Sequence, residues 1–424
     1  MSSLVPDGWA IKPLVELASV DRESLKNSTQ PDYKFWYIDI ASVKTGAVSV
    51  PAEPMVFSDS PSRARKRVCK GDVLMSTVRP NLKSFAYFDK DGDDYIASTG
   101  FAVITAKPSS NGKFIYQSIL ADDVTRQIAG LVAGSNYPAI SSLNVKNLEL
   151  LAPPLPEQQK IAAILSTVDD VIEKTCAQID KLKDLKTGMM QELLTKGIGP
   201  GGVPHTEFKD SPVGRIPVGW NVVPISAIVE KVIDNRGKTP PISHSGYELL
   251  EINSIKKDDV HPDYEKVSKF IDEETYRQWF RAGHPKSGDI LIPTVGTIGS
   301  CSLVCQDRGC IAQNIIALRL RKGVDTRFAY YVLSSQFTVR QIEAILMNAV
   351  QPSLRVPHFL MLHMVLPNES EQTKIGEALG SIDAKLTILR EKSEVAIKLK
   401  KALMQDLLTG KVRVKIDDKE SAVA

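Results

Sequence analysis

Seven basic residues between positions 63 and 83 are the first candidates for chemistry in this sequence. A single acid, Asp72, interrupts them, so the segment carries a local net charge of +6. Its basic members are Arg63, Arg65, Lys66, Arg67, Lys70, Arg79 and Lys83. Such clusters neutralise nucleic-acid phosphates, although an ordinary solvated surface can have the same composition. Arg63 to Arg67 therefore suit phosphate contacts, whereas Arg79, Asn81 and Lys83, directly after a β-rich run, suit base or phosphate contacts.

The second half of the chain contains a weaker version of this pattern. Its polar candidates are Arg236 and Lys238 in NRGKTPP, together with Thr294 and Thr297 on either side of Gly296. The segment GSNYPAIS (134–141) corresponds in place, but not in residues, to AVQPSLRV (349–356). Neutral drift or the reading of a different target in each half would explain that divergence. These two loops contribute the further candidates Ser135, Asn136, Tyr137 and Gln351.

Motifs for catalysis or metal binding are missing from the sequence. It has no GxxxxGK[ST] phosphate loop and no Asn-Pro-Pro-aromatic motif. Cys301, Cys305 and Cys310 have spacings that match no zinc pattern, so we expect small buried hydrophobic residues on strands. DKDGDDY (89–95) has its glycine at the fourth position, which favours a hairpin turn over a calcium loop. We therefore predict a protein that is not an enzyme and holds no metal or cofactor.

Length and composition set the broad class. A chain of 424 residues with 43% apolar and 24% charged residues is expected to form at least two globular domains. No apolar run is long enough to span a membrane, and the N-terminus lacks the pattern of a secretory signal, which together predict a cytoplasmic protein. The net charge of +3 permits a nucleic-acid partner without arguing for one.

The chain contains an internal duplication. PLPEQQKIAAIL (154–165) returns as NESEQTKIGEAL (368–379), and QELLT (191–195) returns as QDLLT (405–409), both 214 residues later. Thirteen of the 40 positions in 157–196 are identical in 371–410. Upstream of residue 116 the offset drifts between 211 and 217. Packed helices demand a strict register and surface loops tolerate insertions, so the two halves share a scaffold and differ in their loops.

The strict part of each half is predicted to be one long helix. Apolar residues recur every seven positions along it, for example Ile161, Val168, Leu182 and Met189. Five such heptads are typical of a coiled coil, and the second copy is the obvious partner. The glycine-rich connection 197–217 lets the second half fold back, so the helices can lie antiparallel. Ahead of each helix we predict strands at 73–80 and 99–107, or 290–297 and 315–322, and helices at 114–131 and 328–347.

With these motifs assembled, the chain resembles the specificity (S) subunit of type I restriction–modification systems. Each half has Pro-x-Gly-Trp, Gly-Asp-(Val/Ile)-Leu, Glu-Gln-x-x-Ile and Leu-Leu-Thr in the same order. The resemblance implies an α+β fold with two mixed α/β target recognition domains, two long antiparallel coiled-coil-like helices and an internal pseudo-two-fold repeat. The implied domains are target recognition domain 1 (1–153), spacer helix 1 (154–196), a linker (197–217), target recognition domain 2 (218–367), spacer helix 2 (368–410) and a C-terminal tail (411–424).

The resemblance also implies a function. Each half reads one half of a bipartite site in double-stranded DNA, and the helices dock two methyltransferase (modification) subunits. Those subunits bring S-adenosylmethionine and methylate adenine. Restriction (motor and nuclease) subunits, with ATP and Mg, cut unmethylated sites. One departure is TVRPNLKS in the first half, where the second half has TVGTIGS. Base contacts therefore do not transfer residue by residue between the halves.

Two other classes of function remain open at this point. A coiled-coil scaffold could bridge proteins or bind DNA without sequence preference, and an orphan nuclease could cut DNA. Two diverged loop sets on one scaffold favour two distinct half-sites over generic bridging. The carboxylates form no recognisable metal cluster, which disfavours the nuclease.

Overall fold

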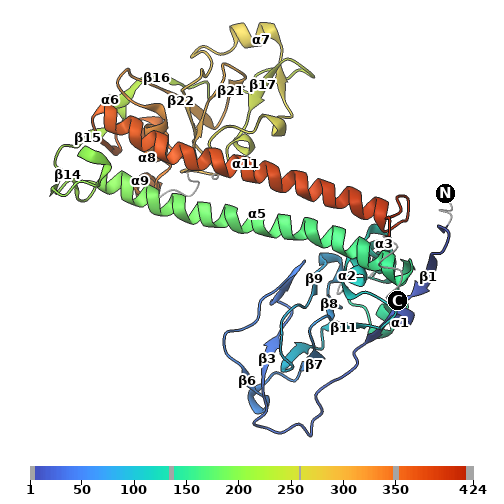
Figure 1. Cartoon of the computed structure of the whole chain (residues 1–424). Helices are drawn as coiled ribbons and strands as arrows, with labels where there is room; N and C mark the ends of the chain where they lie inside the picture. The colour runs from blue at the N-terminus through green and yellow to red at the C-terminus, as the bar shows by residue number, and fades with distance from the viewer. Residues whose placement is uncertain (1–4, 133–137, 257–258, 347–352, 417–424) are drawn as a thin grey trace. The chain divides into compact units, whose positions relative to one another are not determined.

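The computed structural model describes residues 5–132, 138–256, 259–346 and 353–416 (Figure 1). The chain forms two compact units. Unit 1 is Met1–Cys176 with Glu391–Ala424, and unit 2 is Ala177–Arg390. Each unit therefore combines one globular part with about half of each long helix. The sequence-based domain boundaries fall at the helix ends, whereas the compact units divide at the middle of both helices, because each helix half packs within a different unit.

Unit 1 is built on two four-stranded sheets. The first has the strand order β2-β11-β8-β9 and is antiparallel: β2 Ala18–Val20, β11 Phe101–Ala106, β8 Val73–Ser76 and β9 Phe85–Tyr87. The second has the order β6-β3-β10-β7, with β3 and β10 parallel: β6 Met55–Val56, β3 Lys34–Ile38, β10 Tyr95–Ser98 and β7 Ala64–Val68. Two further pairs join β1 (Ala10–Pro13) to β12 (Glu149–Ala152), and β4 (Val43–Lys44) to β5 (Ala47–Val48).

Helices cover the first sheet of unit 1. They are α1 Leu14–Leu17, α2 Gly112–Leu120, α3 Asp122–Val132 and α4 Ser142–Lys146. Asn111 caps α2 by accepting a hydrogen bond from the N–H of Phe114 at 2.9 Å. Such a cap satisfies one of the donors that every helix start leaves free. Side chains of α2 and α3 are buried with those of β8 and β11 in one apolar cluster, which fixes the helices to the sheet.

Unit 2 repeats the four-stranded main sheet, and its second sheet has three strands. Its main sheet has the order β16-β22-β19-β20: β16 Val229–Ile233, β22 Ile315–Leu320, β19 Ile290–Pro293 and β20 Ser302–Leu303. The second has the order β18-β17-β21, with β17 and β21 parallel: β18 Phe270–Ile271, β17 Tyr247–Leu250 and β21 Cys310–Ile311. Two strand pairs complete it: β15 (Asn221–Pro224) with β23 (His363–Leu366), and β13 (Phe208–Lys209) with β14 (Ile216–Pro217). The last pair lies in the predicted linker, which is therefore less irregular than expected.

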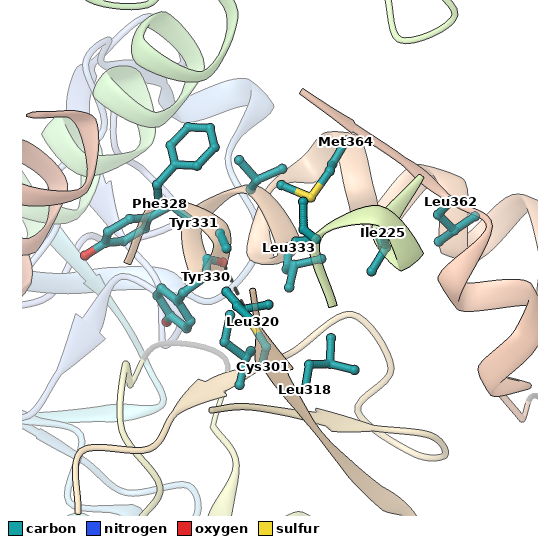
Figure 2. Close-up of a cluster of buried hydrophobic side chains, with 14 of the residues drawn as sticks. Ile225, Cys301, Leu318, Leu320, Phe328, Tyr330, Tyr331, Leu333, Leu362 and Met364 are labelled. Atoms are coloured by element: carbon teal, nitrogen blue, oxygen red, sulfur yellow. Dashed lines mark hydrogen bonds between the residues drawn. The ribbon is translucent and has the colours of Figure 1, made fainter. Parts of the chain in front are cut away.

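The core of unit 2 lies between its main sheet and α8. The helices of this part are α6 Ile225–Ile228, α7 Glu273–Gln278, α8 Thr326–Ser334, α9 Gln336–Leu346 and α10 Val356–Leu360. Figure 2 shows Phe328, Tyr331 and Leu333 of α8 among side chains from β22, β23 and α6. The Cys301 thiol lies in the same cluster and donates to the Tyr330 carbonyl oxygen at 3.7 Å. This one cluster therefore joins α8 to the main sheet, α6 and β23.

The structure corrects two expectations about these elements. Each helix predicted across 114–131 or 328–347 is two helices, with a break at Ala121 and at the corresponding Ser335. Both break residues have extended ψ angles, 157° and 154°, which end a helix. Of the three clustered cysteines, Cys310 is buried on β21 and Cys301 is buried just before β20, whereas Cys305 is exposed. Neither Cys301 nor Cys305 lies in a strand.

The two long helices are α5 (Leu155–Lys196) and α11 (Glu369–Leu407). In unit 1, Lys400 Nζ lies 2.6 Å from Asp169 Oδ1. In unit 2, Lys186 Nζ lies 2.7 Å from Asp383 Oδ1. Residue numbers rise along α5 as their partners' numbers fall along α11, so the helices are antiparallel. The two ion pairs are equivalent in the repeat. Each joins an Asp of one long helix to a Lys of the other, and the two Asp, like the two Lys, are 214 positions apart.

The repeated Glu-Gln at the start of each long helix has a structural reason. Gln158 is 2% exposed; its Oε1 accepts from the N–H of Asn111 at 2.9 Å, and its Nε2 donates to the Pro153 carbonyl at 2.8 Å. Gln372, also 2% exposed, makes the same two contacts with residues 214 positions later, at 3.0 and 2.9 Å. A buried amide needs all its partners. The glutamine therefore ties each long helix to the start of the globular helix beside it.

Candidate nucleic-acid interface

Two turns and one connecting segment meet at the end of the main sheet in unit 1. The turn after β8 begins at Thr77, whose N–H donates to the Gly100 carbonyl, at the start of β11, at 2.8 Å. The Thr77 carbonyl accepts from the N–H of Ile140 at 2.9 Å, and the N–H of Arg79 donates to the Pro138 carbonyl at 2.7 Å. The basic turn and the segment after α3, which the sequence singled out separately, therefore form one surface.

Side chains of this turn differ in their accessibility. Arg79 and Asn81 are exposed, and Pro80–Leu82 form a single turn of 3-10 helix. Lys83 is half-buried, and its Nζ donates to the Leu120 carbonyl at the end of α2 at 3.0 Å. Arg79 and Lys83 both have left-handed backbone conformations, with φ of 49° and 52°. The side chains of Arg79 and Asn81 thus lie on the surface, whereas the Lys83 side chain is hydrogen-bonded to the end of α2.

Unit 2 builds the same end of its sheet from other residues. The N–H of Thr294 donates to the Asn314 carbonyl at 2.7 Å, and its carbonyl accepts from the N–H of Leu354 at 2.7 Å. Its turn has left-handed glycines, Gly296 and Gly299, where unit 1 has Arg79 and Lys83. Thr297 is exposed, as a surface contact requires. Thr294 is 1% exposed and lies inside the unit.

Burial therefore removes Thr294 from the surface on which the sequence-based prediction had placed it. Its backbone joins the turn to the strand beside it, and that pairing faces its side chain inward. The candidate residues Ser135, Asn136, Tyr137 and Gln351 lie outside the described residues.

The basic residues before β8 are less available for phosphate contacts than their number indicates. Arg65, Lys66 and Arg67 lie on β7 and are half-buried. Lys66 Nζ pairs with Asp21 at 2.8 Å and also donates to the Phe101 carbonyl. The other two side chains donate to backbone carbonyls, at 2.8 Å for Arg65 and 3.1 Å for Arg67. Lys66 thus ties β7 to Asp21 and to the start of β11, and Arg67 ties β7 to the segment before β10.

Arg63 and Lys70 flank this strand and differ in their surroundings. Lys70 is paired with Asp91 at 2.8 Å. The Arg63 side chain is exposed and makes no hydrogen bond or ion pair within the described residues. Arg63 is therefore the member of the run best placed to meet a phosphate.

In unit 2, the predicted pair Arg236 and Lys238 lies beside a shallow cavity. The guanidinium of Arg236 makes two hydrogen bonds to Asp234, at 2.8 and 2.6 Å, and these bonds lower the pKa of the Asp234 carboxyl. Lys238 is exposed. The cavity has a volume of about 280 Å³, and its polar lining is Thr239, Glu251, Asn253, Lys269, Gln313 and Asn314.

Sequence reasoning missed Asn253, Gln313 and Asn314. The signal for the last two was available: Ile311-Ala312 matches Ile96-Ala97, and the two residues that follow differ completely between the halves. A shared strand that ends in unlike polar residues is typical of a variable recognition turn.

The described residues contain no group of three or more His, Cys, Asp or Glu side chains that could hold a metal ion. Within the same residues, none of the helices is both long enough and apolar enough to cross a membrane. What the described surface offers is exposed guanidinium, amide and hydroxyl groups, which suit hydrogen bonding to base edges and phosphates.

Comparison with known families identifies the architecture. The model of the type I restriction modification DNA specificity domain matches this chain twice, over residues 6–184 and 217–399. The chain belongs to this specificity family. Each match covers one globular part and most of the long helix that follows it, so the duplication seen in the sequence is a duplication of the family's domain.

Individual relatives agree with this assignment. The type I restriction enzyme MjaVIII specificity subunit of Methanocaldococcus jannaschii is 32% identical over 291 residues, which cover 66% of either chain. The MjaX specificity subunit of the same organism, itself a putative one, is 27% identical over 97% of this chain and 95% of its own.

Solved structures show the same fold. The S subunit of a type I restriction–modification system from M. genitalium has a TM-score of 0.62 at 14% identity, covering 96% of this chain and 97% of its own. A chain from a study of the assembly of a type I system has a TM-score of 0.51 at 23% identity and covers 96% of this chain and 99% of its own. The chain is thus a DNA-specificity subunit with a mixed helix-and-strand fold.

Proposed function

We propose that each unit reads one half of a bipartite DNA site and that the two halves differ. The observation that carries this proposal is the equivalent backbone pairing of Thr77 with Gly100 and of Thr294 with Asn314. The two units thus share one platform at the end of the main sheet. They present different exposed side chains on it: Arg79 and Asn81 in unit 1, and Thr297 and Asn314 in unit 2. A shared backbone with unlike polar groups suits two different base sequences.

Partner subunits would dock on the long helices. Leu185 on α5 and Leu399 on α11 are identical residues 214 positions apart, and their exposed fractions are 51% and 50%. Large apolar residues exposed at matching places on each copy support two equivalent docking surfaces. We expect two modification subunits there, and a restriction subunit in the complete complex. S-adenosylmethionine, ATP and Mg would belong to those partners, with no cofactor in this chain.

Replacement of one leucine at a time tests the docking surfaces. Leu185→Glu or Leu399→Glu should reduce the number of modification subunits bound per chain from two to one, because a charge in an apolar contact is costly to desolvate. The double variant should bind none. Analytical ultracentrifugation of the purified components gives the stoichiometry, and two subunits still bound to the double variant would refute this assignment.

An exchange of recognition parts tests the reading of two half-sites. Residues 11–150 are replaced by the corresponding part of another family member, and methylated adenines are mapped in cellular DNA. One half of the methylated motif should change while the other half and the spacing stay the same. A change in both halves would refute the assignment of one half-site to each unit. Methylation without any sequence preference would favour the bridging scaffold instead.

A further inference from the structure

The platform at the end of each main sheet consists of two adjacent turns, and the two units place their left-handed polar residues on opposite turns. In unit 1 the turn after β8 carries Arg79, and the adjacent turn carries Gly100. In unit 2 the turn after β19 carries Gly296, and the adjacent turn carries Asn314. Because Thr77 and Thr294 make equivalent backbone pairings, Arg79 corresponds to Gly296, and Gly100 corresponds to Asn314.

Backbone geometry shows where a side chain is kept despite strain. Arg79 has φ of 49°, in the left-handed region that side chains rarely adopt, and Asn314 has φ of 67° in the same region, which asparagine adopts more readily than arginine. At the position of Arg79, unit 2 uses Gly296, for which φ of 73° is unstrained. Glycine at residue 79 would therefore adopt the same left-handed conformation without strain. Strained residues that persist where glycine would do are concentrated at functional sites.

Steric room on the second turn differs between the two units. A Cβ at Gly100 would lie 2.5 Å from Cδ1 of Ile40, so the Ile40 side chain would have to shift to admit a side chain there. Unit 2 already has a side chain at the corresponding position. The Asn314 side chain is exposed, borders the cavity of about 280 Å³ and makes no hydrogen bond within the described residues.

Neighbouring residues with the same strain have structural roles. The Nζ of Lys83 donates to the Leu120 carbonyl at 3.0 Å. The amide of Gln313 donates to Thr239 Oγ1 at 2.7 Å and to the Gly237 carbonyl at 3.2 Å, which ties the second turn of unit 2 to the segment 237–239. These contacts hold the turns in shape, and the Arg79 and Asn314 side chains are exposed on them.

We propose that Arg79 reads a guanine in one half-site and that Asn314 reads an adenine in the other. An arginine guanidinium donates two hydrogen bonds to O6 and N7 of guanine. An asparagine amide donates to N7 of adenine and accepts from its N6 amino group. This inference rests on the proposed reading of one half-site by each unit, and it names the side chain and the base that each unit uses.

The test uses the full-length chain assembled with its modification subunits, and the methylated motif is the readout. Arg79→Gly should still fold and unfold cooperatively on heating, because glycine adopts the left-handed conformation of residue 79 readily. One guanine position should lose a preference of about 10-fold or more. Asn314→Gly should remove the preference for adenine at one position of the other half-site. In each variant the untouched half-site is the internal control.

A second variant at each position keeps the result interpretable. Arg79→Asn, which tolerates the left-handed conformation, should shift the preference at the same position from guanine toward adenine. The inference is overturned if the wild-type complex has a bipartite motif and the glycine variants leave every base preference intact. It is also overturned if Arg79→Gly changes both half-sites. A wild-type complex that methylates without any motif would instead refute the proposed function itself.

Discussion

Removal of the Asp383 carboxylate should destabilise unit 2 far more than removal of its repeat equivalent, Asp169, destabilises unit 1. Asp383 accepts from Lys186 Nζ at 2.7 Å and from the Tyr331 hydroxyl at 2.6 Å. The Asp383 and Lys186 side chains are only 9% and 18% exposed. Asp383→Ala would leave a nearly buried ammonium and a buried hydroxyl without a partner. Breaking a buried pair in this way costs ~3–5 kcal/mol.

Asp169 is the matched control because the same residue makes the same type of contacts at the corresponding place. It pairs with Lys400 at 2.6 Å and accepts from the Gln117 amide at 2.6 Å. Lys400 is no more exposed than Lys186, at 16% against 18%, so the difference between the sites lies in the carboxylates. The Asp169 side chain is 33% exposed, so water reaches the place it vacates, and Asp169→Ala should cost about 1 kcal/mol. The difference between the two variants should be at least ~2 kcal/mol.

Native-state hydrogen exchange, followed peptide by peptide, measures the two units separately. With Asp383→Ala, amides of α8 and the first half of α11 should lose protection, while those of α2 keep it. With Asp169→Ala, the small loss should be confined to α2 and the first half of α5. Equal losses in the two variants, or a loss below about 1 kcal/mol for Asp383→Ala, would refute the reasoning from burial.

The further predictions concern charge. Burial lowers the pKa of His284 below its ordinary 6.5, so the unfolded chain takes up the proton before the folded chain does. Unit 2 should therefore lose stability as pH falls below 6.5. His284→Gln should make the free energy of unfolding, measured by urea titration, depend less on pH. Burial raises the pKa of Asp72 above its ordinary 3.8, so ionisation costs stability at higher pH, and Asp72→Asn should be as stable as the wild type or more so at pH 7. The equivalent Asp289→Asn, which loses the Arg319 ion pair at 2.7 Å, should be less stable in the same assay. Arg63→Ala should weaken binding to all DNA sequences and flatten the salt dependence by about one unit, and a changed sequence preference would contradict a phosphate contact.

The long helices were predictable because the heptad spacing is a local sequence pattern and occurs twice in the chain. The heptad spacing and the strict offset of 214 residues predicted both helices and the antiparallel arrangement, which the repeated Asp–Lys pairs confirm. The main strands of each half were equally visible as β-rich runs. The breaks at Ala121 and Ser335 were missed because neither residue is a strong helix breaker.

The recognition surface was predictable only in part, because accessibility depends on partners that are distant in the sequence. The acid that neutralises Lys66 is Asp21, 45 residues earlier, so the count of charges between 63 and 83 overstated the basic surface. Thr294 was selected for its place in a turn, but its backbone pairing with Asn314 faces it inward. Asn314 was missed although unlike residues follow the shared Ile-Ala pair, because the backbone pairing that places it beside the turn of Thr294 is formed only in the folded chain.

The central claim, that two unlike units on one chain read two unlike half-sites, is tested most directly by the methylated motif. The full chain is expressed with its modification subunits, and every methylated adenine is mapped in the host DNA. The account predicts one bipartite motif with two different specified halves separated by a fixed number of unspecified bases. A palindromic motif, a motif with a single specified half, or methylation without any motif would contradict it.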